Sequence, residues 1–113
     1  KKNISKLNIN NVNYILGDFD STIEKVVKNP IDVLYIDGNH SYEATKRYFN
    51  YFLKYSHKDS IFIFDDIRWS RDMYRAWEEI IYHDDVSISF DIFRMGIVFF
   101  KQNIAKKNYV LRY

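Results

Sequence analysis

The chain has 113 residues, of which 47% are hydrophobic and 19% aromatic, so it is long enough for one domain with a substantial core. The formal net charge is +2 with both signs mixed along the chain, which argues against a nucleic-acid partner, and the absence of cysteine excludes disulfides and thiolate metal sites. No apolar run approaches the ~20 residues that cross a bilayer, and no signal peptide is visible, so we expect a cytoplasmic protein with no membrane partner.

The first third of the chain predicts the end of a helix, then a strand, then a second helix. Residues 4–9 have the spacing of a helix end, and residues 12–16 have the composition of a strand. Residues 21–24 (STIE) form a capping box, in which the first and last side chains bond each other's backbone N–H groups. We therefore expect a helix that starts at Ser21 and stops before Pro30.

The centre of the chain holds two near-continuous apolar runs, residues 31–36 and 61–64, with a helical pattern over residues 41–55 between them. Such runs are typical of strands buried on both faces, and hence of parallel strands. The carboxyl ends of adjacent parallel strands meet at one edge, where ligands bind in open α/β sheets. The polar side chains that follow the two runs should therefore crowd one crevice: Asp37, His40, Asp65 and Asp66.

The sequence of the last third of the chain predicts a helix, followed by a segment in which apolar and polar residues alternate. A helix should begin near Ser70, and the apolar–polar alternation over residues 86–92 predicts an antiparallel or edge strand. Residues 94–96 form a turn, residues 97–100 a buried strand, and residues 109–113 a short final strand. The resulting prediction is an α/β fold with a mostly parallel sheet that closes in a C-terminal antiparallel β-hairpin.

Three carboxylates at neighbouring strand ends would repel one another unless something neutralises them. Two unit charges ~4 Å apart cost about 4 kcal/mol at an effective dielectric near 20. A hard divalent cation such as Mg²⁺ would remove this cost, and it prefers oxygen ligands. The alternative is that Asp65 or Asp66 caps a turn or pairs with a nearby cation, while Asp37 bonds the backbone of its own turn. The nearby cations are Lys46, Arg68 and Arg71.

Three segments resemble a known family. Residues 34–43 read LYIDGNHSYE and are similar to the IDG(D/N)HSYE segment of the small O-methyltransferase-like family often labelled methyltransferase domain 24. Residues 61–67 resemble that family's strand ending in two Asp residues, and Gly17 with Asp18 resembles its GD turn. The resemblance implies a class I S-adenosylmethionine-dependent methyltransferase with a three-layer, Rossmann-like sheet, acting on the hydroxyl of a small-molecule methyl acceptor.

The resemblance also implies roles for the polar residues at the strand ends. In metal-dependent O-methyltransferases, an Asp ending the fourth strand and an Asp pair ending the fifth hold the metal. These positions match Asp37, Asp65 and Asp66. His40 stands at the offset from Asp37 where catechol-type enzymes have a basic Lys. The expected catalytic pair is therefore His40, which would take the substrate proton near neutral pH, together with Asp37.

The cofactor-binding residues implied by the resemblance are Asp18, Phe19 and Asp37. Asp18 would contact the adenine amino group, and Phe19 would pack against the ring. The alternatives are purely structural roles, in which Asp18 caps a helix and Phe19 joins the core. Similarly, His40 could cap the following helix or serve only as a partner of Asp66.

The glycine-rich half of the family's fold has no counterpart in this sequence, which holds only three well-separated glycines and does not begin with Met. We therefore expect residues 1–113 to be one partial domain, the C-terminal half with strands three to seven, whose exposed strand edge favours a homodimer. The alternative to an active methyltransferase is an inert half-domain that works only with its missing half or by self-association. A Mg²⁺-dependent hydrolase is less favoured, because no nucleophile or phosphate loop accompanies the Asp residues.

Overall fold

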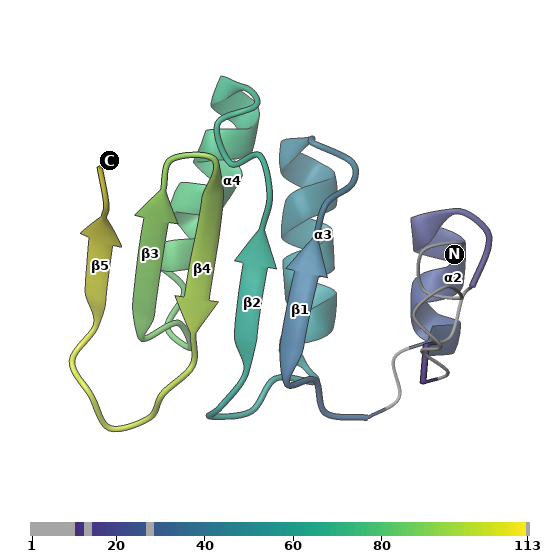
Figure 1. Cartoon of the computed structure of the whole chain (residues 1–113), viewed down its shortest axis with the longest axis horizontal. Helices are drawn as coiled ribbons and strands as arrows, with labels where there is room; N and C mark the ends of the chain where they lie inside the picture. The colour runs from purple at the N-terminus through teal and green to yellow at the C-terminus, as the bar shows by residue number, and fades with distance from the viewer. Residues whose placement is uncertain (1–10, 13–14, 27–28, 113) are drawn as a thin grey trace.

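The computed structural model describes residues 11–12, 15–26 and 29–112 and shows a mixed α/β chain with one sheet (Figure 1). The elements, in chain order, are α2 (Phe19–Val26), β1 (Val33–Ile36), α3 (Tyr42–Leu53), β2 (Ile61–Phe64), α4 (Arg71–Ile81), β3 (Ile88–Ile92), β4 (Met95–Phe99) and β5 (Lys107–Val110). The helix end expected over residues 4–9 lies outside the described residues. None of the helices in the described ranges has the length and apolar character needed to cross a membrane.

The five strands lie in the order β1-β2-β4-β3-β5. The β1–β2 and β3–β5 pairs are parallel, whereas β4 runs antiparallel to both of its neighbours. The C-terminal hairpin of β3 and β4 is therefore present, but the expectation of a mostly parallel sheet is not confirmed, because two of the four pairings are antiparallel. The carboxyl ends of β1, β2, β3 and β5 all lie at one edge of the sheet, at the top of Figure 1.

The expected strand over residues 12–16 is not found in the described part of the chain. Val12, Ile15 and Leu16 belong to no strand, and residues 13–14 lie outside the described ranges. An extended segment without a neighbour leaves its backbone N–H and C=O groups unpaired, so an apolar run alone does not make a strand. Consequently β1 has no strand beyond it and forms an edge of the described sheet.

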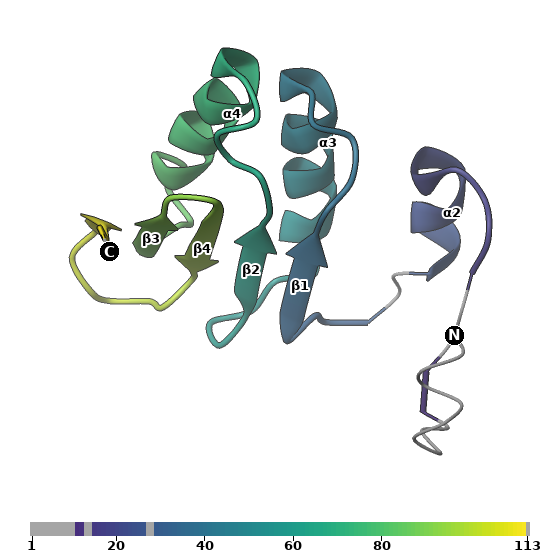
Figure 2. The same cartoon turned by 45° about the horizontal axis from the view of Figure 1, so that its top comes forward.

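Helices α3 and α4 cover one face of the sheet, as Figures 1 and 2 both show. The pairing register puts Phe62 beside Val98 and Phe64 beside Gly96, and these residues pack under the two helices with no more than trace exposure. Phe64 also lies near Phe49 of α3 and Trp77 of α4, with ring centroids 6.1 and 6.2 Å away. The core is thus an aromatic layer between one sheet face and two helices.

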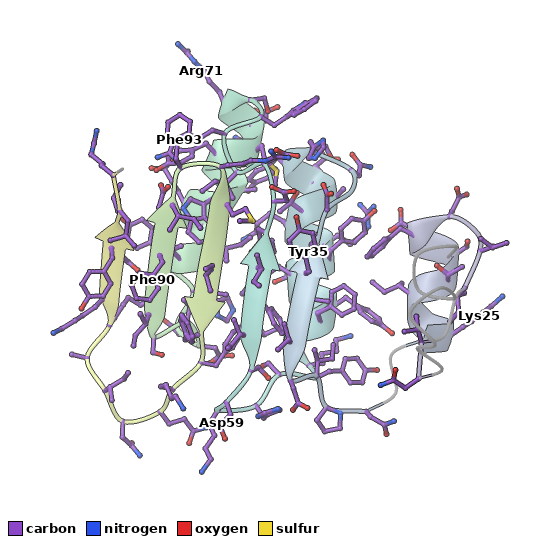
Figure 3. The ribbon with its side chains drawn as sticks, viewed as in Figure 1. Lys25, Tyr35, Asp59, Arg71, Phe90 and Phe93 are labelled. Carbon is purple, nitrogen blue, oxygen red and sulfur yellow. The ribbon has the colours of Figure 1, made fainter. Side chains whose placement is uncertain are left out.

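The opposite sheet face is open in the described structure, and Figure 3 shows Tyr35 and Phe90 standing on it. Val33 is 62% exposed and Tyr35 is 51% exposed, so the expectation that residues 31–36 are buried on both faces is wrong. The described residues form two layers, not the expected three. Composition does not separate the two cases, because an edge strand with one open face can be as apolar as a strand buried on both faces.

Local capping sets where the helices begin. Ser41 and Ser70 precede α3 and α4, and their hydroxyls accept hydrogen bonds from backbone N–H groups three residues on, at 3.1 Å in both cases. These two starts agree with the prediction. Helix α2 does not, because it begins at Phe19 and the Ser21 hydroxyl donates to the Asp18 carbonyl instead of capping.

Candidate functional site

The polar residues after β1 and β2 meet at the carboxyl edge of the sheet. Asp37 follows β1 directly, and the backbone N–H of Asp65 donates to the Ile36 carbonyl at 3.0 Å, which ties the two strand ends together. His40 lies in the turn between β1 and α3. The structure gathers one ligand atom from each of Asp37, His40 and Asp66 within 4.8 Å of one another. We call these three residues the edge cluster.

His40 presents an unused nitrogen to the edge cluster. Its Nε2 lies 3.1 Å from Asp66 Oδ2 and 3.8 Å from Asp37 Oδ1. The nitrogen is buried, yet it makes no hydrogen bond with any described residue, since the short approach to Asp66 lacks hydrogen-bond geometry. The ring stacks on Trp69 with centroids 4.4 Å apart and an interplanar angle of 23°, which fixes its orientation. A buried nitrogen without a hydrogen bond is a group that a bound molecule could satisfy.

Asp65 faces away from the edge cluster, although it was expected to be a metal ligand with Asp37 and Asp66. It is 4% exposed, and its carboxylate accepts hydrogen bonds from the Tyr35 hydroxyl at 2.6 Å and from the Asp66 backbone N–H at 2.9 Å. The hydrogen bond from Tyr35 is the main reason that the pKa of Asp65 lies below its usual value, and the same bond raises the pKa of Tyr35 to about 12. Asp65 thus acts as an acceptor inside the fold, and His40 takes its place in the cluster.

The backbone of Asp66 explains why two adjacent carboxylates diverge. Its φ is 57°, in the left-handed region that Asp and Asn tolerate better than most residues. This turn sends the Asp66 side chain toward His40 while that of Asp65 points to Tyr35. The sequence alone shows two neighbouring Asp residues and does not indicate which one faces the crevice.

Arg94 is a site residue that the sequence reasoning missed. Its Nε lies 3.3 Å from an oxygen of Asp65 and 3.3 Å from an oxygen of Asp66, and these two charges raise the pKa of the guanidinium. Arg94 sits in the β3–β4 turn, two residues before Gly96, which pairs with the last residue of β2. The signal was present as an Arg two residues before a glycine, but its meaning depends on the register between β2 and β4.

Two of the three cations expected to neutralise the Asp residues have other partners. Arg68 pairs with Asp91 at 2.5 Å, and Lys46 lies 3.5 Å from Glu79. In the described chain, the positive charge at the edge cluster therefore comes from Arg94 and not from these two residues.

Two of the three residues expected to bind the cofactor, Asp18 and Phe19, line a shallow hollow next to the edge cluster, whereas Asp37 does not line it. Its walls come from the start of α2, from the turn that follows Asp37, and from α3: Asp18, Phe19, Asp20, Ser21, Gly38, Asn39 and Tyr48. Phe19 packs on Tyr48 with ring centroids 4.3 Å apart but stays partly exposed. Asp20 binds Arg47 of α3 at 2.9 Å, which holds α2 against α3. The structure therefore brings Asp18 and Phe19 to the turn that carries Asp37.

Comparison with known proteins adds two findings. A family model described as a methyltransferase domain matches residues 2–67, a stretch that contains the whole edge cluster and ends just after it. An uncharacterized protein of Acanthamoeba polyphaga mimivirus is 37% identical over 90 residues, which is 72% of this chain and 41% of that protein. The chain therefore spans less than half the length of this relative.

Proposed function

The chain belongs to the methyltransferase domain family, and on that premise we propose that the protein transfers a methyl group from S-adenosylmethionine to the hydroxyl oxygen of a small molecule. The observation that carries this proposal is the buried Nε2 of His40, which makes no hydrogen bond with the described residues and lies at the carboxyl edge, where α/β sheets bind ligands. The chain covers 41% of its relative, so the activity is proposed for the whole protein.

The hollow beside the edge cluster has side chains that suit S-adenosylmethionine. The carboxylate of Asp18 can accept a hydrogen bond from an adenine amino group, and the partly exposed ring of Phe19 offers a flat apolar surface. The carboxylates of Asp37 and Asp66 favour a positively charged sulfonium nearby. When bound, S-adenosylmethionine supplies an electrophilic methyl group.

His40 is proposed as the group that accepts the proton of the acceptor hydroxyl. The hydroxyl proton would move to Nε2 of His40, which makes no hydrogen bond with the described residues. At the same time the hydroxyl oxygen would take the methyl group, and the electron pair of the broken methyl–sulfur bond would stay on sulfur. Asp66, with Oδ2 at 3.1 Å, stabilises the imidazolium that results, and stacking on Trp69 keeps the ring aimed at the acceptor. Arg94 offsets part of the negative charge around Asp65 and Asp66.

We also consider a competing role for Nε2 of His40, as a ligand of a divalent metal ion. The edge cluster offers one imidazole nitrogen and two carboxylates, a mixed set that suits Mn²⁺ or a similar transition metal better than the Mg²⁺ expected from three carboxylates. Asp37, His40 and Asp66 would hold such an ion, which would lower the pKa of the acceptor hydroxyl. His40 cannot both ligate a metal through Nε2 and take a proton there, so the two proposals exclude each other.

One assay tests methyl transfer and separates these two proposals. The protein, dialysed against EDTA, is mixed with isotope-labelled S-adenosylmethionine and a panel of hydroxylated aromatic and aliphatic molecules, and transfer is measured with and without added Mn²⁺ or Mg²⁺. Transfer that EDTA does not reduce would support His40 as the base. Transfer seen only with Mn²⁺ would support a metal at the edge cluster. No transfer under any condition would count against the function.

Cofactor binding is checked separately by calorimetry with S-adenosylhomocysteine. Replacing Asp18 with Asn should weaken this binding by about tenfold or more, the scale of one hydrogen bond to a charged group. Replacing Asp84 with Asn removes one carboxylate at the opposite edge of the sheet and should leave binding unchanged. Equal binding by both variants would remove Asp18 from the cofactor site.

A second candidate is a half-domain that functions only as part of a larger assembly, here proposed as a homodimer. It is favoured by β1, whose outer edge has no partner strand in the described chain and whose residues Val33 and Tyr35 are more than half exposed. Light scattering should then give twice the 13.8 kDa mass, and Val33→Lys should restore the monomer. The control Ile104→Lys changes an exposed residue outside the sheet and should stay dimeric. A monomeric wild type would contradict the dimer.

A further inference from the structure

A second hollow opens at the same edge of the sheet, on the side away from α2, and the proposed function leaves it unexplained. Three segments form its walls: Arg68 after β2, the end of β3, and the residues at and after the end of β5. The lining residues are Arg68, Asp91, Phe93, Val110, Leu111 and Arg112. The backbone N–H of Leu111 donates to the Asp91 carbonyl at 2.8 Å, so the C-terminal wall is fixed to β3.

Asp91 and Arg68 neutralise each other at the base of this hollow. One oxygen of the Asp91 carboxylate accepts from Arg68 Nη1 at 2.5 Å and from the Phe93 backbone N–H at 2.9 Å. The other accepts from Arg68 Nη2 at 2.8 Å and from the Tyr74 hydroxyl at 3.1 Å. These bonds fill the roughly four acceptor positions of a carboxylate, and the side chain is buried. Asp91 therefore has little capacity left for a ligand and leaves no net charge after pairing.

Phe93 is held in an unfavourable conformation that keeps its ring in solvent. Its φ is 73°, a left-handed value that is rare and costly for a bulky residue. The bond from its N–H to Asp91, and the bond that its carbonyl accepts from Arg68 at 2.7 Å, hold the turn in place. The ring is 64% exposed and rests on the Arg68 guanidinium, 4.9 Å from its centroid. Figure 3 shows Phe93 at the tip of the β3–β4 turn, where it offers a flat aromatic wall.

Arg112 gives the hollow its charge. It is exposed, and among the lining residues it is the one charged side chain for which the described structure shows no ion pair. Val110 and Leu111 beside it are apolar and about half exposed. An aromatic wall, an aliphatic wall and one free guanidinium together suit a planar apolar body that carries a carboxylate, which Arg can bind through two parallel hydrogen bonds.

We propose that this hollow binds a small aromatic carboxylate, with its ring on Phe93 and its carboxylate on Arg112, and that this molecule is the methyl acceptor. Only the role of this molecule as methyl acceptor rests on the methyl transfer proposed above. The two sites share one turn, since Phe93 is followed by Arg94, which contacts Asp66 of the edge cluster. The Arg94 carbonyl also accepts from the Ile67 N–H at 3.0 Å, which holds this turn against the end of β2.

The binding part is tested without cofactor by titrating benzoate into the ¹⁵N-labelled protein and following its NMR spectrum. Benzoate should shift the resonances of Phe93, Leu111 and Arg112, and phenol and acetate should each bind at least about tenfold more weakly, since each lacks one of the two recognised groups. Arg112→Gln and Phe93→Asn should each weaken benzoate binding by a similar factor. Asn tolerates the left-handed backbone, so Phe93→Asn removes the wall without straining the turn. Lys25→Gln removes one charge on α2 and should change nothing.

Three outcomes would overturn the binding site: no shift at the hollow, equal binding of phenol, or undiminished binding by Arg112→Gln. The acceptor assignment is tested by methyl transfer to hydroxybenzoates. Arg112→Gln should raise KM for a hydroxybenzoate and leave KM for an uncharged phenol unchanged. Benzoate binding without transfer to any hydroxybenzoate would overturn the acceptor assignment alone and leave the binding site standing. Transfer to uncharged acceptors without benzoate binding would uphold the proposed function and reject this inference.

Discussion

Replacing His40 with Gln should lower kcat/KM for methyl transfer by about 10²–10⁴-fold, the usual contribution of a positioned base. Gln keeps a polar group near the place of Nε2, but it cannot take the hydroxyl proton. The stacked Trp69 and the neighbouring Asp66 remain, so the affinity for S-adenosylhomocysteine and the melting temperature should change little. Steady-state rates over a range of acceptor concentrations, with calorimetry and thermal melting on the same samples, measure all three quantities.

The matched control for this experiment is His57→Gln. His57 Nε2 bonds Asp32 at 2.7 Å, and both residues lie at the amino edge of the sheet, away from the edge cluster. Its replacement should leave kcat/KM unchanged. If His40→Gln keeps most of the wild-type rate, His40 is not the base. If its loss of rate is accompanied by loss of Mn²⁺ dependence, His40 is a metal ligand instead.

Features set by short stretches of sequence were predictable. The starts of α3 and α4 depend on Ser41 and Ser70, whose hydroxyls cap backbone groups three residues away. The β3–β4 hairpin likewise follows from alternation over a few residues around one turn. The meeting of Asp37, His40 and Asp66 needed only two strands to be parallel neighbours, which the apolar runs and the helix between them indicate.

Features that depend on distant partners were not predictable. The role of Arg94 follows from the register of β4 on β2, a pairing between segments about thirty residues apart in which a shift of one residue would turn every side chain over. The exposure of Val33 and Tyr35 depends on whether another segment covers their face of the sheet. The composition of the strand does not show whether such a segment exists. The choice between Asp65 and Asp66 depends on one left-handed backbone angle.

Replacing Gly96 with Ala should be the most damaging small substitution in the sheet. Gly96 lies in β4 between Phe64 and Asp91, directly beneath Trp77 of α4. A Cβ there would lie 2.4 Å from two carbons of the Trp77 ring, and Trp77 is 1% exposed. The free energy of unfolding should fall by about 1–3 kcal/mol or more, the cost of overpacking a core, as measured by urea denaturation.

Two further variants show whether the ring causes this loss. Gly38→Ala is the matched control, because a Cβ at Gly38 meets no atom within 4 Å, and its effect should be much smaller. Trp77→Leu should be destabilising alone, since it removes buried ring volume, but in that background Gly96→Ala should cost less than in the wild type. The difference is the coupling energy of a double-mutant cycle, and contacting residues typically show about 0.5–3 kcal/mol. Equal costs in both backgrounds would mean that Gly96 is required for a reason other than its contact with Trp77.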